Sequence, residues 1–226
     1  MVDRFAKEDF LYDLSPSRIE KWMSIFYQTS EIVCNRDVNS VLEVGGGRNL
    51  NREICKYFGV EHQVCDVISD YNPDFFCNFL DFTPVEPFDL VCAFQMLEHN
   101  PLEDLPVLLK KMVKLSKKYV FISVPYNGAM FSINISFRIF GRARKLDWLF
   151  TTNLFATKKT DRKKLDERIK KYPEQRYDPH WWEVGRQELP KPKFRQLLKS
   201  CDLKITKEFH NRNFPYHLFY LCEIDK

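Results

Sequence analysis

The chain has 226 residues, of which 44% are hydrophobic and 29% charged, and its formal net charge is +4. This length and composition favour one soluble α/β domain that carries an insertion. No uncharged apolar run reaches the roughly 18 residues that a membrane-spanning helix needs. The N-terminus (Met1–Phe10) lacks the apolar core of a signal peptide, so we expect a cytoplasmic protein. Its seven cysteines are scattered and form no Cys-x-x-Cys pair, which favours reduced thiols over disulfides or zinc.

Hydrophobic periodicity predicts alternating helices and strands as far as Pro125. A capping box at Ser17 and Glu20 opens a helix that runs to about Asn35. The strands that follow are expected at 40–44, 61–65, 88–94 and 119–124, with helices at 49–58 and from Asn100 to 115, the latter with Pro101 in its first position. This order is typical of a doubly wound, mostly parallel sheet. After the insertion, a helix at 193–200 and strands at 203–209 and 218–224 predict a closing antiparallel hairpin.

We therefore expect a single domain over 1–226 with four parts. These are an N-terminal helical cap (1–39), a ligand-binding core (40–125), a basic and aromatic insertion (126–185), and a C-terminal helix with closing strands (186–226). Between Tyr126 and Pro179 there are 13 Lys or Arg and 6 Asp or Glu, a balance of 13 − 6 = +7, which leaves 4 − 7 = −3 for the remainder. The uneven charge indicates a specialised element, which we expect to be a helical or loop insertion. Because residues 178–185 end it just before the final helix, it can fold over a substrate as a lid.

The stretch from Val41 to Asn49 carries the first functional signal. A short apolar strand leads through Glu43 into three glycines, Gly45 to Gly47, and a helix pattern opens near Asn49. Glycines let the backbone approach a ligand closely, and such a turn predicts a nucleotide-like ligand at the carboxyl end of a parallel sheet. A nicotinamide fingerprint would need a third spaced glycine where this chain has Leu50.

Glu43 with the glycines that follow it forms the pattern E/D-x-G-x-G, which resembles motif I of the class I S-adenosylmethionine-dependent methyltransferases. Three further segments agree with this family. Asp66 ends the second strand, Phe88-Asp-Leu-Val-Cys-Ala-Phe-Gln-Met-Leu-Glu-His99 is similar to the FDxVxxxxxLEH signature of the type-11-like branch, and the next strand ends in Ser-Val-Pro125. That branch includes ubiquinone-biosynthesis O-methyltransferases. The resemblance implies a Rossmann-like methyltransferase sheet, with S-adenosylmethionine as the cofactor.

The resemblance also implies roles for single residues. Glu43 would orient the glycine turn, Gly45 and Gly47 would pass under the methionine portion, and Asp66 would hold the ribose hydroxyls. The remaining cofactor-binding residues implied are Asp81 and Phe82 at the adenine, and Phe94 and Gln95 facing the sulfonium and its methyl group. Structural alternatives stay open, because Asp66 or Asp81 could merely cap a turn and Phe94 could be core.

A hydroxyl acceptor needs a base with a pKa near the working pH, which favours histidine. His99 directly follows the strand 88–94, and His180 lies between Pro179 and two tryptophans at the end of the insertion. Both are candidate catalytic residues. Some relatives bind a divalent metal through Glu-x-x-Glu-His, but Gln95 occupies the first of these positions, so we expect no metal. His210 and His217 are expected to be structural.

The insertion allows more than one function. The apolar segment 130–140, followed by Arg142, Arg144 and Lys145, has the composition of an element that contacts an anionic membrane surface. Alternatively, its cations neutralise phosphates of an acceptor, or the segment is a solvated pair of helices that caps the substrate. No RNA-binding module accompanies these cations, so nucleic acid is not expected. The sequence thus favours O-methylation of a small-molecule or glycan-like acceptor over a quinone or lipid acceptor at a membrane, or over a non-catalytic cofactor-binding protein.

Overall fold

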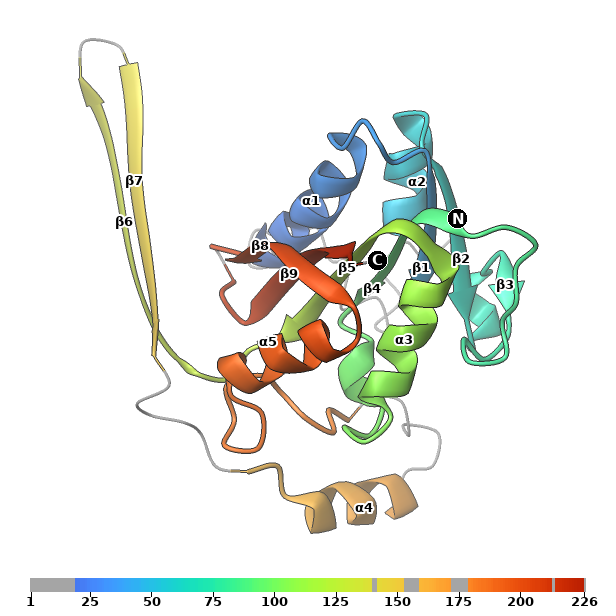
Figure 1. The fold of residues 1–226 in the computed structure, drawn as a ribbon. Coiled ribbons are helices and arrows are strands. Elements are labelled where there is room, and N and C mark those ends of the chain that lie inside the picture. The colour runs from blue at the N-terminus through green and yellow to red at the C-terminus, as the bar shows by residue number, and fades with distance from the viewer. Residues whose placement is uncertain (1–18, 140–141, 153–158, 172–178, 213, 226) are drawn as a thin grey trace, which may run out of the picture.

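The structure is a computed structural model that describes residues 19–139, 142–152, 159–171, 179–212 and 214–225. Ser17 of the expected capping box lies outside these residues. Seven strands form one sheet in the order β3-β2-β1-β4-β5-β9-β8 (Figure 1). Neighbours from β3 to β5 are parallel, and β9 pairs antiparallel with both β5 and β8. The strands are β1 (Ser40–Val44), β2 (Glu61–Asp66), β3 (Phe75–Phe76), β4 (Phe88–Phe94), β5 (Ser116–Pro125), β8 (Leu203–His210) and β9 (His217–Ile224).

Helices cover both faces of this sheet, because the central strands are apolar on both sides. The helices α1 (Ile19–Val33) and α2 (Leu50–Tyr57) pack on one face, around a core that includes Leu90 and Phe121. The helices α3 (Leu105–Leu115) and α5 (Lys191–Ser200) pack on the other, around a larger core. The doubly wound, mostly parallel sheet with its closing antiparallel strands is confirmed. In the described part of the chain, no helix is both long and apolar enough to cross a membrane.

Two boundaries differ from the sequence predictions. The helix expected to begin at Asn100 begins only at Leu105, and Pro106, not Pro101, occupies its first turn. Residues between them form a turn in which the Asp104 N–H donates to the Pro101 carbonyl at 3.0 Å. The two-residue strand β3 was not predicted, because a segment of that length shows no periodicity.

The secondary structure of the insertion differs more from the sequence prediction. The insertion contains the expected helical part, α4 (Arg162–Lys171), but residues 129–139 and 142–152 form paired β-strands where we expected a helix or a loop. The strands β6 (Ala129–Ile139) and β7 (Arg142–Thr152) pair antiparallel with each other and with no other strand of the described chain. The hairpin extends away from the body of the molecule (Figure 1). In the sequence, strict alternation of apolar residues from Phe131 to Ile139 is the signal for this strand.

Candidate functional site

The glycine turn lies between β2 and the loop that follows β4. The Gly45 N–H donates to the Cys65 carbonyl at 2.9 Å, and both Gly45 and Gly47 have positive φ, 71° and 54°. A Cβ on Gly45 would lie 2.4 Å from the Cγ of Met96, and one on Gly46 would lie 2.7 Å from Val64. The turn therefore requires glycine for its backbone conformation and for lack of space.

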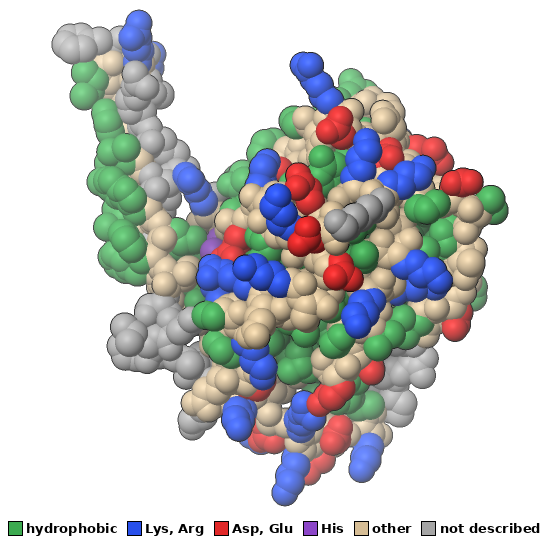
Figure 2. Space-filling view, in the orientation of Figure 1, with side chains coloured by type: hydrophobic (Ala, Val, Ile, Leu, Met, Phe, Trp, Pro, Cys, Tyr) green, Lys and Arg blue, Asp and Glu red, His purple; other side chains and the backbone are tan. Residues whose placement is uncertain are grey.

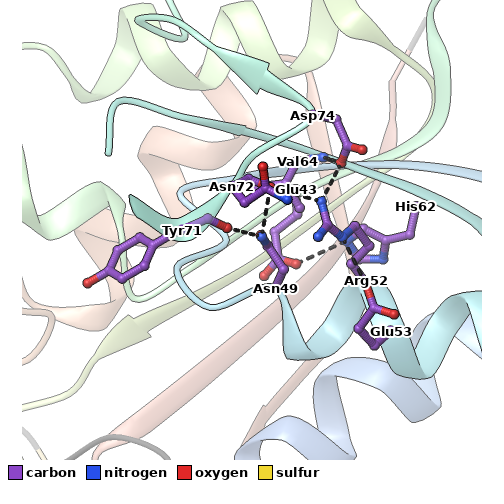
Figure 3. Close-up of polar contacts among 9 residues, drawn as sticks. All are labelled: Glu43, Asn49, Arg52, Glu53, His62, Val64, Tyr71, Asn72 and Asp74. Atoms are coloured by element: carbon purple, nitrogen blue, oxygen red, sulfur yellow. Dashed lines mark hydrogen bonds and ion pairs between the residues drawn. The ribbon is translucent and has the colours of Figure 1, made fainter. Parts of the chain in front are cut away.

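Glu43 lies beneath this turn and is almost fully buried. One carboxylate oxygen is 3.0 Å from His62 Nε2 (Figure 3). The other accepts a hydrogen bond from Asn51 Nδ2 at 2.9 Å. These contacts join β1 to β2 and to α2. They agree with a role for Glu43 in orienting the turn, by fixing the elements on either side of it.

A second group of contacts fixes the loop between β2 and β3. The Asn49 side chain donates to the carbonyls of Tyr71 and Asn72, and Arg52 forms an ion pair of 3.0 Å with Asp74 (Figure 3). Asp74 also accepts from the Val64 N–H at 2.9 Å. None of these residues was predicted to do more than begin a helix, because the contacts join segments about 20 residues apart.

Asp66, at the end of β2, is tied directly to the glycine turn. One carboxylate oxygen accepts from the Gly47 N–H at 3.2 Å and the other from the Ile68 N–H at 3.0 Å. Burial raises the pKa of Asp66, although these backbone N–H groups oppose the rise. A carboxylate has about four acceptor positions, so Asp66 can still accept hydrogen bonds from ligand hydroxyls.

The other residues implied for the cofactor occupy different environments. Asp81 is exposed, whereas Phe82 is buried against Phe75 with ring centroids 4.6 Å apart. Phe94 is buried against Phe121 at the end of β4. Gln95 follows with a positive φ of 52° and donates through Nε2 to Ser123 Oγ at 3.2 Å. Phe82 and Phe94 are thus part of the core, and Gln95 is held against β5.

His99 and His180 are brought together, although 80 residues separate them in the sequence. Their ring centroids are 5.0 Å apart. The backbone N–H of Trp181 donates to the Glu98 carbonyl at 2.8 Å, which fixes the end of the insertion against the loop after β4. Met96, in the same loop, is the residue that contacts Gly45. The two candidate bases therefore lie at the same edge of the sheet as the glycine turn.

Glu183 is the residue that holds His180. One of its oxygens lies 3.1 Å from His180 Nδ1 and accepts from the Tyr216 hydroxyl at 2.7 Å, and the other accepts from Asn127 and Arg186 at 2.6 and 2.7 Å. Burial opposes ionisation, but these hydrogen bonds outweigh it and keep the pKa of Glu183 well below its usual range. Glu183 is thus an anion at neutral pH. Glu183 was not among the predicted site residues, because two of its partners, Asn127 and Tyr216, lie 56 and 33 residues away in the sequence.

Glu98 differs from Glu183 in its surroundings. It is fully buried, and neither carboxylate oxygen has a hydrogen-bond partner among the described residues. Burial raises the pKa of Glu98 to about 8. Glu98, His99 and His180 place ligand atoms within 4.8 Å of one another, and one carboxylate with two imidazoles could hold a divalent metal. The expectation of no metal considered only residues 95–99, because spacing could not reveal that His180 joins them.

The remaining histidines of the C-terminal hairpin have internal partners. His210 lies 2.6 Å from the Pro215 carbonyl and 2.9 Å from Lys191 Nζ. His217 Nδ1 is 2.7 Å from the Ser24 hydroxyl. These contacts agree with the structural role expected for both.

A cavity of about 540 Å³ lies between the start of α4 and the end of the insertion. It combines aromatic and cationic side chains and is lined by Leu102, Lys159, Thr160, Arg162, Trp181, Trp182, Gln187, Glu188 and Lys193. Because Trp181 is the neighbour of His180, the cavity adjoins the segment that carries the candidate base.

Comparisons with known proteins agree with this architecture. No protein-family model matches the sequence, and no curated protein matches it significantly. Among solved structures, a S-adenosylmethionine-dependent methyltransferase from Clostridium acetobutylicum is 12% identical, with a TM-score of 0.56 over 97% of this chain and 96% of that one. The chain has a Rossmann-like methyltransferase fold. Two further similar structures have this fold. The N-methyltransferase NodS from Bradyrhizobium japonicum, in complex with S-adenosylhomocysteine, is 11% identical with a TM-score of 0.55 (95% and 90% covered), and the sugar N-methyltransferase KedS8 from Streptoalloteichus is 10% identical with a TM-score of 0.51 (92% and 87% covered).

Proposed function

We propose that the protein is a S-adenosylmethionine-dependent methyltransferase that methylates an oxygen of a small-molecule or glycan-like acceptor. The observation that carries the proposal is the junction of Gly47 with Asp66 at the carboxyl edge of a methyltransferase-type sheet. A turn that excludes side chains and a buried carboxylate next to it form a site for a ribose-containing ligand at the place where such sheets bind nucleotides.

The residues present fit this cofactor. Gly45 and Gly46 leave room only for backbone, Asp66 has free acceptor positions for hydroxyls, and the turn after β4 lies against Gly45 through Met96. We assign Asp66 to the ribose and the backbone of Gly45 and Gly47 to the methionine portion, with Phe94 and Gln95 bordering the methyl group. Asp81 and Phe82 would border the adenine. Asp81 is exposed, whereas Phe82 is buried and would form part of the wall of the site. The bound cofactor would supply a methyl group already activated on a sulfonium.

The acceptor then has to be aligned and, if it is a hydroxyl, deprotonated. We assign His180 as the base that removes the proton of the acceptor hydroxyl. With its Nδ1–H directed at the ionised Glu183, 3.1 Å away, the ring would present an unprotonated Nε2, and the anion would stabilise the imidazolium that forms. His99 packs against this ring and would contact the acceptor or position His180.

The cavity next to Trp181 supports the class of acceptor. A tryptophan face suits a sugar or aromatic ring, and Lys159, Arg162 and Lys193 suit an acceptor that carries anionic groups. A sugar-modifying N-methyltransferase among the similar structures shows that this fold accepts such a substrate in another protein. The insertion would close over this acceptor as a lid. A quinone or lipid acceptor is the second candidate, favoured by the exposed apolar side chains of the β6–β7 hairpin.

Calorimetric titration with S-adenosylhomocysteine tests the cofactor site. We expect Asp66→Ala to weaken binding at least tenfold, because it removes a buried acceptor, and Asp81→Ala, at an exposed position, to weaken it much less. Equal affinity of Asp66→Ala and the wild type would overturn the assignment.

Transfer from methyl-labelled donor to a fractionated metabolite extract tests catalysis. We expect a labelled product that His180→Ala reduces mainly through kcat, with donor affinity unchanged. Tight donor binding with no product from any extract would identify a non-catalytic binding protein instead. Cell fractionation would test the predicted cytoplasmic location.

A further inference from the structure

One face of the β6–β7 hairpin is a continuous apolar surface. Register places Phe131 opposite Phe150, Ile133 opposite Trp148, and Ile135 opposite Leu146, and directly opposed residues project from the same face of a strand pair. Phe137 and Ile139 continue this face along β6, since residues two apart point the same way. All eight of these side chains are exposed, and Phe131 is 63% exposed. We call them the apolar face.

The described residues of the body do not cover this face. Figure 2 shows hydrophobic side chains in a strip along the projecting hairpin. Both hydrophobic cores of the described chain consist of residues outside β6 and β7. A two-stranded ribbon alone in water is at best marginally stable, so an exposed apolar face of this size indicates a partner that buries it.

The charges at the far end of the hairpin identify the kind of partner. Residues 129–152 contain four cations, Arg138, Arg142, Arg144 and Lys145, and a single acidic residue, Asp147. Register places Arg142 opposite Ile139 and Arg144 opposite Phe137, so the apolar face ends in positions held by arginine. A partner that matches this surface combines an apolar layer with a negatively charged one.

We propose that the hairpin docks the protein on the surface of an anionic phospholipid bilayer. The apolar face would enter the boundary between headgroups and acyl chains, while the cations at the tip would contact lipid phosphates. The hairpin would lie in the plane of the membrane and not cross it. Among the described strands, β6 and β7 pair only with each other, which leaves backbone groups at both edges that hydrocarbon cannot satisfy. A second copy of the chain would offer a matching apolar face but no countercharge, since each hairpin has one acid and four cations.

This inference is independent of catalysis, so vesicle flotation of the full chain tests it separately. We expect the protein to float with vesicles of phosphatidylcholine that contain about one third phosphatidylglycerol, and not with phosphatidylcholine alone. The variant Phe131→Ser/Ile133→Ser/Ile135→Ser should lose flotation. Its matched control, Tyr57→Ser/Phe58→Ser/Val85→Ser, removes three exposed apolar side chains from the body and should float like the wild type.

The charge contribution has its own variant. Arg142→Ala/Arg144→Ala should weaken binding to the anionic vesicles roughly 30-fold, at about fivefold per cation, and Lys117→Ala/Lys199→Ala should change it little. Titration with S-adenosylhomocysteine and the thermal midpoint show whether each variant remains folded. Loss of flotation in a folded hairpin variant, with flotation retained in its control, supports the proposal.

Trp148 reports directly on insertion. Its fluorescence should be quenched by lipids brominated on the acyl chains in wild type, and this component should disappear in Trp148→Phe. Three results would overturn the proposal: no flotation of the wild type, equal flotation with neutral vesicles, or a stable dimer in light scattering that the Phe131→Ser/Ile133→Ser/Ile135→Ser variant dissociates. The last would show that a second copy covers the apolar face.

Discussion

At the scale of single residues, Gly45 shows how the site depends on the absence of a side chain. Gly59 offers a matched comparison, because its φ of 81° is similar but a Cβ there would meet nothing within 4 Å. We expect Gly59→Ala to cost about 1 kcal/mol for the left-handed backbone. Gly45→Ala should cost about 1–3 kcal/mol more, because its Cβ meets Met96, and should also weaken S-adenosylhomocysteine binding. Urea unfolding measures the loss of stability in each variant, and calorimetry measures the affinity for S-adenosylhomocysteine. Equal losses of stability in Gly45→Ala and Gly59→Ala would show that the contact with Met96 is unimportant.

His217 predicts how stability depends on pH. The Ser24 hydroxyl accepts from Asn211 and lies 2.7 Å from His217 Nδ1, so it still has its own proton to donate to an unprotonated Nδ1. Burial and then Lys21 lower the pKa of His217 from 6.5 to about 4. The unfolded chain therefore binds the proton first as the pH falls, so stability is complete above pH 6.5 and decreases down to about pH 4. The contribution is about 3 kcal/mol.

Urea unfolding between these pH values should show the decrease, and His217→Gln should reduce its slope. His210, whose pKa burial and Lys191 also lower to about 4, will add a similar slope that persists in this variant. Identical slopes in His217→Gln and the wild type would contradict the assignment of His217 as a neutral acceptor.

Glu98 bears on the question of a metal. With a pKa near 8 its carboxyl is mostly protonated at neutral pH, and a protonated carboxyl is a poor ligand. We therefore expect methyl transfer to survive treatment with a chelator, and the purified protein to contain no stoichiometric metal. Loss of activity that zinc or manganese restores in the wild type, but not in Glu98→Gln, would instead identify Glu98, His99 and His180 as a metal site.

At the scale of elements, hydrophobic periodicity predicts the helices and strands whose buried face is set by their own sequence. The strands β1, β2, β4 and β5 and the helices α1, α2 and α5 were predictable, because their apolar residues repeat with the period of the structure they form. The β6–β7 hairpin was not predicted, although Phe131, Ile133 and Ile135 alternate strictly, because a high apolar content is equally consistent with a buried helix. Pro101 misplaced the start of α3, since proline suits any turn as well as a first helical position.

The hairpin should also be dispensable for the fold. Met130 and Thr151 are directly paired at its base, so residues 131–150 can be replaced by an Asn-Gly turn that suits a two-residue hairpin. Neither core loses a residue, and we expect the free energy of unfolding to change by less than about 1 kcal/mol. Unchanged S-adenosylhomocysteine affinity would accompany this result. A collapse of stability would show that the hairpin contacts the body more strongly than its position indicates.

At the scale of the whole molecule, the two ends of the insertion are joined. The Asn127 N–H donates to the Val184 carbonyl at 2.7 Å, and the Val184 N–H donates to the Pro125 carbonyl at 3.0 Å. The insertion thus leaves the sheet at the end of β5 and returns to the same place. Its returning segment brings His180 next to His99. Sequence motifs offered candidates for a cofactor site because Gly45, Asp66 and Gln95 lie at or directly after strand ends. They could not predict the environment of His180, because Asn127, Glu183 and Tyr216 meet only when the insertion has closed.

Trp182 attaches the end of the insertion to the hydrophobic core. It is fully buried, packs against Phe194 with centroids 6.0 Å apart, and donates through Nε1 to the Asn100 carbonyl at 3.0 Å. Trp182→Ala should therefore cost about 3–5 kcal/mol through the cavity it leaves. Because it also releases the segment that carries His180, methyl transfer should fall more than donor binding.

Trp181→Ala is the matched control, since Trp181 is only partly buried and lines the cavity next to α4. We expect it to cost about 1–2 kcal/mol and to affect the acceptor's KM. Urea unfolding with donor titration and kinetics separates the two variants. Equal destabilisation by both would mean that the insertion is anchored along its whole return segment, whereas the contacts of Trp182 indicate one buried attachment point between the insertion and the body of the protein.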